Sequence, residues 1–161
     1  MADVIEHFQD PQLFLESLVS WIPDETKIVL SIPNIAFGAV RLDLLKGNFR
    51  YVDSGILEKT HLRFFTIETL RQLVSAIGLS MEKLYFLQRN FLTTDIQHNM
   101  ADVGWRTLFN LMKDEFASTY QFIVVLSRTP VTTEQEYYGI GTRIRIPEIL
   151  MSMIKKWFKQ T

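Results

Sequence analysis

The 161-residue sequence contains no cysteine, which excludes disulfides and thiolate metal sites and is compatible with a cytoplasmic location. It has no run of 18 apolar residues and no charged-then-apolar N-terminal signal, so we do not expect it to enter a membrane. The formal net charge is only −1, and the absence of a basic field gives no reason to expect a nucleic-acid partner. The hydrophobic share of 47% is ordinary for one folded globular domain.

Glycine is also scarce, because the sequence has only seven and they are scattered. No G-x-G-x-x-G pattern follows a predicted strand, and Gly139-Ile140-Gly141 lies late in the chain without a strand before it. A glycine-rich turn between a strand and a helix is what cradles the phosphates or the methionine part of many nucleotide cofactors. These residues therefore contain no recognisable cofactor turn of that kind.

Helix and strand patterns alternate along the first 128 residues. Asp10-Pro11 provides an N-cap followed by proline in the first helical turn, and Thr66 is expected to cap a helix that Gly78 ends. Residues 27–32 form a near-continuous apolar run, typical of a central strand covered on both faces. Predicted helices cover 11–22, 39–45, 66–77 and 102–116, and predicted strands cover 1–6, 27–32, 80–87 and 120–127. This alternation predicts an α/β fold.

The tail of the chain differs from this pattern. Residues 129–146 are polar and rich in turn formers, and we interpret them as a linker. Residues 147–161 carry apolar side chains on one side and lysines near the end, which predicts an amphipathic C-terminal helix. We favour packing of this helix against the domain or a partner over insertion at a membrane interface, because the helix is short and the chain is not basic.

The first residues, Asp3-Val4-Ile5-Glu6-His7, concentrate two carboxylates and an imidazole in five positions. Such groups are suitable ligands for a divalent ion, or form an acid/base group with its orienting partner. The alternative is an ordinary solvated surface.

Three motifs in register give this cluster a context. They are D-V-I-E-H-x-x-D-P at residues 3–11, S-I-P-N at 31–34 and T-H-L-R-F-F-T at 60–66. In this order they resemble the C-terminal half of class I S-adenosylmethionine-dependent methyltransferases, closely over residues 1–90 and loosely over 118–127. The resemblance implies a partial Rossmann-like sheet equivalent to strands four to seven, with flanking helices. Strand 27–32 would then be central and parallel to residues 1–6, and strand 120–127 antiparallel.

The chain also departs from that family. The glycine-rich turn and the acidic residue that hold the methionine and ribose parts of S-adenosylmethionine in the family have no counterpart here. By the resemblance Met1 falls inside the fourth strand, and Ala2 and Asp3 would lie beside the cofactor. We therefore expect the 161 residues to bind S-adenosylmethionine weakly or not at all.

The resemblance also implies a site. Related O-methyltransferases, including the plant small-RNA enzymes, look like metal-assisted enzymes, and by position their ligands fall on Asp3, Glu6, His7 and His61. The ion would be Mg²⁺ or Mn²⁺, with imidazole favouring Mn²⁺. We expect His7 and His61 to lie in one cluster at the C-terminal end of the sheet.

Alternatives to a metal remain open. His7 can be a metal-free base oriented by Glu6, and His61 can instead cap the helix after Thr66 or tie down the 50–60 loop.

Two further residues are candidates for substrate binding. Asn34 follows a predicted strand at the edge where open α/β sheets bind ligands, although it can equally serve the turn after Pro33. Arg63 can pair with a phosphate or carboxylate of a substrate, or be a solvated charge.

Two function classes follow. The first is O-methyl transfer to a hydroxyl of a sugar, lipid precursor or small metabolite, completed by the missing half, so that a small molecule or glycan would be the partner. The second is a non-catalytic methyltransferase-like fragment or interaction module. In either case the truncated strand at 1–6 leaves an open edge, through which we expect homodimerisation.

Overall fold

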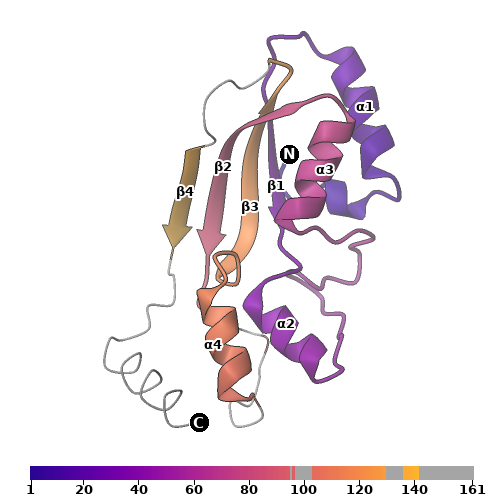
Figure 1. The fold of residues 1–161 in the computed structure, drawn as a ribbon. Helices are drawn as coiled ribbons and strands as arrows, with labels where there is room; N and C mark the ends of the chain where they lie inside the picture. Colours follow the sequence, from indigo (N-terminus) through magenta and orange to yellow (C-terminus); the bar gives the residue numbers. More distant parts are fainter. Residues whose placement is uncertain (95, 97–102, 130–135, 142–161) are drawn as a thin grey trace.

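The computed structural model describes residues 1–94, 96, 103–129 and 136–141, and in these residues the chain folds as the mixed α/β structure expected (Figure 1). The strands are β1 (Ile28–Pro33), β2 (Ser80–Gln88), β3 (Thr119–Ser127) and β4 (Glu136–Gly141). They form one sheet of order β1-β3-β2-β4, in which β3 runs antiparallel to both neighbours and β4 runs parallel to β2. The antiparallel pairing of β1 with β3 agrees with the sequence prediction.

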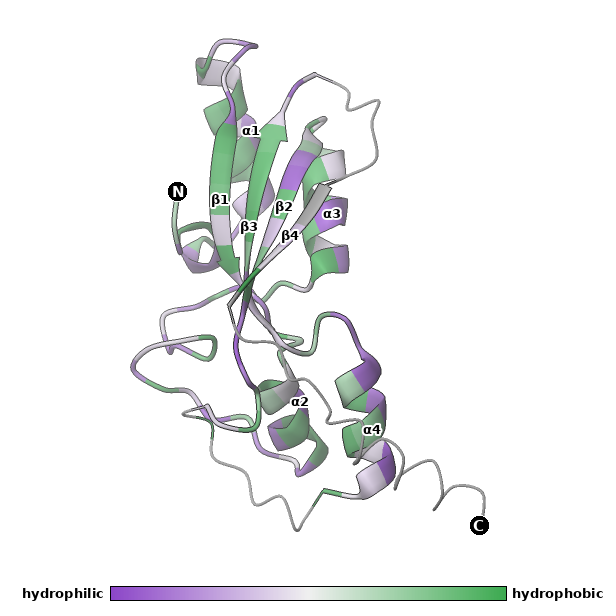
Figure 2. Cartoon of the chain, turned by 90° about the vertical axis from the view of Figure 1, so that its left-hand side faces the viewer, coloured by the Kyte–Doolittle hydropathy of each residue, from purple (hydrophilic) through white to green (hydrophobic). Residues whose placement is uncertain are grey.

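Helices α1 (Pro11–Trp21) and α3 (Ile67–Ala76) cover one face of this sheet (Figure 1). Ile28, Leu30 and Ile32 of β1 point into the hydrophobic cluster beneath these helices. Figure 2 looks onto the opposite face, over which no helix of the described residues lies. Val29 on this face is 47% exposed. The expectation that strand 27–32 is covered on both faces is therefore wrong for the part of the chain that the structure describes.

The N-terminal residues pair with β1 only briefly. Ala2 forms an isolated parallel bridge with Ser31, and β1 therefore lies between this short segment and β3. At Asp3 the backbone turns into the left-handed region, with φ 50°, and residues Ile5–His7 form a 3-10 helix, η1. The predicted strand over residues 1–6 is thus wrong beyond Asp3, because the chain leaves the sheet to bury Ile5 in the core and to turn Glu6 inward.

The helix signals in the sequence act as expected. The side chain of Asp10 accepts a hydrogen bond from the Leu13 amide at 2.9 Å and caps α1. Thr66 caps α3 through a reciprocal box in which Thr69 supplies the partner side chain. Gly78 follows α3 with φ 71°, the left-handed conformation that ends many helices.

A second hydrophobic cluster lies beyond one end of the sheet. It is built by α2 (Gly38–Leu45), α4 (Trp105–Lys113) and the loops around them (Figure 1). Phe91 is fully buried here, and a Cβ on Gly38 would lie 2.6 Å from its ring. Only glycine therefore lets α2 begin against this ring. This cluster supports the loops that carry the candidate site.

The tail is described only in part. Strand β4 falls inside the range expected to be a linker, and the sequence pattern did not indicate it. The predicted C-terminal helix over 147–161 lies outside the described residues. Within the described ranges, no helix combines the length and apolarity needed to cross a bilayer.

Candidate functional site

Two segments far apart in sequence are joined beside the carboxyl end of β1. The backbone carbonyl of Glu6 in η1 accepts hydrogen bonds from the amides of Leu62 at 2.8 Å and Arg63 at 3.0 Å. This pair of bonds places the residue before Leu62, His61, next to η1. The T-H-L-R segment and the E-H pair are therefore held together by main-chain contacts, whatever their side chains do.

His7 and His61 meet at this junction. Their ring centroids are 4.8 Å apart and the rings meet edge to face at 74°. His61 is 6% exposed, whereas His7 is partly exposed. The structure thus brings the two histidines into one cluster, as the sequence led us to expect.

Backbone carbonyls fix the orientation of both imidazoles. Nδ1 of His61 lies 3.0 Å from the carbonyl oxygen of Ile56, and Nδ1 of His7 lies 3.1 Å from that of Thr60. Because a carbonyl oxygen only accepts, each Nδ1 must carry the proton. In the neutral rings Nε2 is then left with a free lone pair. A histidine that donates its other nitrogen to a carbonyl is the usual arrangement of a metal ligand.

The Glu6 carboxylate is buried beside these rings. The residue is 1% exposed, and neither side-chain oxygen has a hydrogen-bond partner among the described residues. The nearest cation-forming atom is Nε2 of His61, 4.0 Å from Oε1. Burial raises the pKa of Glu6 above its ordinary value, and the nearby Asp3 charge adds to this, while the backbone and both histidines oppose it. A buried carboxylate without partners is costly and calls for a ligand that supplies positive charge.

The ligand atoms of Glu6, His7 and His61 all lie within 4.8 Å of one another. Small side-chain rotations bring such a group to the spacing of ligands around one ion. The donor set, two imidazoles and one carboxylate, suits Mn²⁺ better than Mg²⁺, which prefers oxygen ligands. Because the carboxylate has no partner among the described residues and both rings are oriented, these three residues fit a divalent metal ion.

Asp3 is not part of this group. It is exposed, and its Oδ1 accepts a hydrogen bond from Nε2 of Gln121 at 2.6 Å. The same Gln121 nitrogen lies 2.5 Å from the hydroxyl oxygen of Ser31, so that Asp3 is tied to the ends of β1 and β3. The structure gathers three of the four expected ligands and places Asp3 at the sheet edge. Asp3 still faces Glu6 closely enough to influence its pKa.

Asn34 has a structural position. It is fully buried, its Nδ2 donates to the carbonyls of Thr119 at 2.8 Å and Phe116 at 3.3 Å, and its Oδ1 accepts from the Ala36 amide. All its hydrogen-bonding groups are engaged by backbone, so it has none left for a substrate. These contacts are those expected of the turn alternative for Asn34.

Arg63 and Ala2, two further candidate binding residues, both lie at exposed positions. The side chain of Arg63 is exposed and, in the residues that the structure describes, makes no hydrogen bond or ion pair. Ala2 is exposed and is held beside β1 by its bridge to Ser31. The backbone amide of Arg63 is bonded to the Glu6 carbonyl at 3.0 Å, and both positions remain compatible with the ligand roles expected of them.

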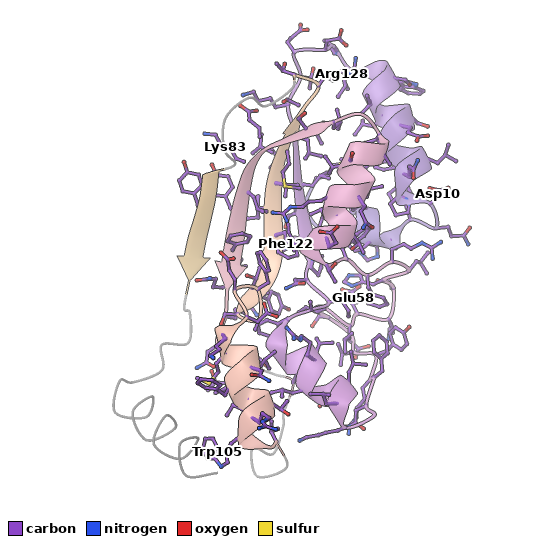
Figure 3. The ribbon with its side chains drawn as sticks, in the orientation of Figure 1. Asp10, Glu58, Lys83, Trp105, Phe122 and Arg128 are labelled. Carbon is purple, nitrogen blue, oxygen red and sulfur yellow. The ribbon has the colours of Figure 1, made fainter. Side chains whose placement is uncertain are left out.

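Glu58 is a neighbour that the sequence did not single out. Its Oε2 lies 4.0 Å from Nε2 of His61, and the side chain is 31% exposed in the loop between α2 and α3 (Figure 3). The spacing Glu58-x-x-His61, with both side chains at one turn, was the available signal.

The first 84 residues, which carry the site, match the family model described as a methyltransferase domain. This match covers more than half of the chain. The chain belongs to the methyltransferase domain family. S-adenosylmethionine is the usual cofactor of that family. No curated protein matches the chain significantly.

Among solved structures, the chain is similar to the crystal structure of the small RNA methyltransferase HEN1. The sequence identity is 17% and the TM-score 0.46, over 83% of this chain. The chain spans only 14% of that protein's length.

Proposed function

We propose that this methyltransferase domain binds and activates the methyl-accepting hydroxyl in an O-methyl transfer, with a divalent ion held by Glu6, His7 and His61. The observation that carries the proposal is the Glu6 carboxylate, which is buried beside two imidazoles whose Nδ1 atoms are already engaged and has no hydrogen-bond partner among the described residues. A structural ion pair would show a cation in contact with Glu6, and the described residues provide none within 4.0 Å other than His61.

The residues of the proposed site have different roles. Glu6 supplies the negative charge, and the carbonyls of Ile56 and Thr60 hold His61 and His7 with Nε2 available as a ligand. When bound, the ion would lower the pKa of a coordinated hydroxyl and fix its direction. Because His7 is partly exposed, this side of the group is open to solvent, which would take the released proton.

The metal-free alternative, with His7 as base and Glu6 as its orienting partner, has less support. The Nδ1 of His7 is oriented by the Thr60 carbonyl, and the Glu6 carboxylate makes no hydrogen bond within the described part of the chain. For S-adenosylmethionine the residues present do not fit, because no glycine-rich turn follows a strand in this sequence. We propose a hydroxyl of a sugar, lipid precursor or small metabolite as the methyl acceptor.

Calorimetry on the full chain tests this proposal. Mn²⁺ should bind at one site and more tightly than Mg²⁺, and Glu6→Gln or His61→Gln should remove that binding. Glu16→Gln is the matched control, because Glu16 is an exposed carboxylate on α1. S-adenosylmethionine should bind weakly or not at all.

A folded chain that binds no Mn²⁺ would contradict the metal proposal and favour a non-catalytic module. Micromolar binding of S-adenosylmethionine by the isolated chain would show that the missing cofactor turn is not needed.

A further inference from the structure

A cavity of about 870 Å³ lies on the other side of the loop that holds His61. Residues 52–57 form one wall, and the segment 88–94 that follows β2 forms another. Figure 1 shows these segments near the end of the sheet at which α2 and α4 lie. None of Glu6, His7 and His61 lines the cavity. It is therefore a separate space whose role the metal group does not explain.

The 52–57 wall is folded tightly against Tyr120. The amide of Val52 donates to the Leu57 carbonyl at 2.9 Å, and the Lys59 amide returns to the Val52 carbonyl at 3.0 Å. Gly55 has φ 98°, and a Cβ there would lie 3.0 Å from the Tyr120 hydroxyl. Glycine thus allows the loop both its left-handed turn and its close approach to Tyr120. The wall is a preformed structure, as ligand cavities usually require.

Two arginines give the cavity its positive character. The guanidinium carbon of Arg89 lies 4.0 Å from the centre of the Tyr120 ring, a cation–π contact that restrains the side chain beside the cavity. Arg50 lines the same cavity. Within the described ranges neither arginine has a hydrogen bond or ion pair to a carboxylate.

The carboxylates that also line the cavity are engaged elsewhere. Asp53 accepts a hydrogen bond from Nζ of Lys59 at 2.6 Å. Asp43 has an interaction partner of its own. Among the described residues that line the cavity, Arg50 and Arg89 are the cations, and neither is paired with these carboxylates.

Neutral polar groups complete the lining. Gln88 and Asn90 bring side-chain amides, and Asn90 is already oriented because its Oδ1 accepts from the Leu92 amide at 2.9 Å. The hydroxyl of Thr94 is buried and has no hydrogen-bond partner among the described residues. Amides and hydroxyls around two guanidiniums match a ligand that has both an anionic group and hydroxyls.

The loop links this cavity to the metal group. Ile56 lines the cavity, while its carbonyl oxygen accepts from Nδ1 of His61. Glu58, one residue beyond this wall, lies 4.0 Å from Nε2 of the same histidine. A ligand seated against the 52–57 wall is therefore separated from the proposed reaction site by a single loop.

We propose that this cavity binds an anionic polyhydroxy compound, a sugar that carries a phosphate or a carboxylate, through Arg89 and Arg50. That this compound is the methyl acceptor rests on the proposed function, whereas the anion site itself depends only on the cavity. The stacked guanidinium of Arg89 presents parallel donors to the anionic group, and Gln88, Asn90 and Thr94 face its hydroxyls.

The test is a titration of the full chain with glucose 6-phosphate, glucuronate and glucose, followed by the amide NMR signals of the 52–57 and 88–94 segments. We expect saturable shifts in both segments with at least one anionic sugar and none with glucose at the same concentration. The sugar phosphate alone would identify a phosphate site, and glucuronate alone a carboxylate site.

Charge-neutralising variants then locate the anion. Arg89→Gln and Arg50→Gln should each weaken binding about tenfold, since each removes a charge-assisted hydrogen bond. Arg106→Gln, at an exposed arginine of α4 outside the cavity, should bind as the parent does. Equal binding of glucose and the anionic sugars, no binding at all, or full binding by Arg89→Gln together with Arg50→Gln would overturn the proposal.

The two proposals fail separately. Mn²⁺ binding with no anionic-sugar binding overturns only the cavity proposal. Anionic-sugar binding with no Mn²⁺ binding supports the anion site and overturns only the metal proposal.

Discussion

Two polar side chains are buried near the carboxyl end of β1, and their surroundings are opposite. Asn34 is 0% exposed, and backbone groups from three residues satisfy its amide. Glu6 is 1% exposed, and neither of its oxygens has a hydrogen-bond partner in the described part of the chain. An orphaned buried group costs roughly 1–3 kcal/mol, more when charged. The same fold thus hydrogen-bonds the Asn34 side chain fully and leaves the Glu6 carboxylate without a partner. This contrast distinguishes a structural polar residue from a proposed ligand-binding one.

The largest expected effect is at Asn34. Asn34→Ala should lower the free energy of unfolding by about 3 kcal/mol, because three buried hydrogen bonds are lost at once: those to the carbonyls of Phe116 and Thr119 and that from the amide of Ala36. Urea denaturation measures the change. Asn110→Ala, at an exposed position of α4, is the control and should change stability little. A cost below about 1 kcal/mol for Asn34→Ala would mean that its bonds are not the structural element described.

An effect of opposite sign is expected at Glu6. In the presence of a chelator at neutral pH, Glu6→Gln should raise the free energy of unfolding by about 1 kcal/mol, because it removes a buried carboxylate charge that has no partner. The exposed Glu16→Gln serves as the control. If Glu6→Gln instead destabilises the metal-free chain, the carboxylate has a structural partner and the contrast with Asn34 fails.

A smaller effect is expected in the pH dependence of the free energy of unfolding. The pKa of Glu6 is raised in the folded chain above its ordinary value of 4.5, so the folded state holds the proton more tightly than the unfolded state. Its contribution to stability is complete below pH 4.5 and is lost as pH rises through the folded pKa. Denaturation of the metal-free chain at a series of pH values should show this loss in the parent and not in Glu6→Gln. Parallel profiles for the two chains would contradict the assignment.

The sequence predicted the parts of the site that depend on local patterns and on motif order. The α/β alternation, the caps at Asp10 and Thr66 and the meeting of His7 with His61 followed from residues close in sequence or from the family resemblance. The left-handed turn at Asp3 did not, since an alternating pattern favoured a strand there. The role of Asn34 depends on carbonyls more than 80 residues away, and no local pattern reveals such partners. Strand β4 is short and contains two glycines, and its parallel pairing with β2 depends on residues about 50 positions earlier in the chain.

The most direct test of the central claim is crystallographic. Crystals of the full chain grown with Mn²⁺ should show one anomalous peak in contact with the side chains of Glu6, His7 and His61, and the peak should vanish in Glu6→Gln. A Mn²⁺ peak bound to other residues would contradict the account. So would a structure without this peak in which a protein group donates a hydrogen bond to the Glu6 carboxylate.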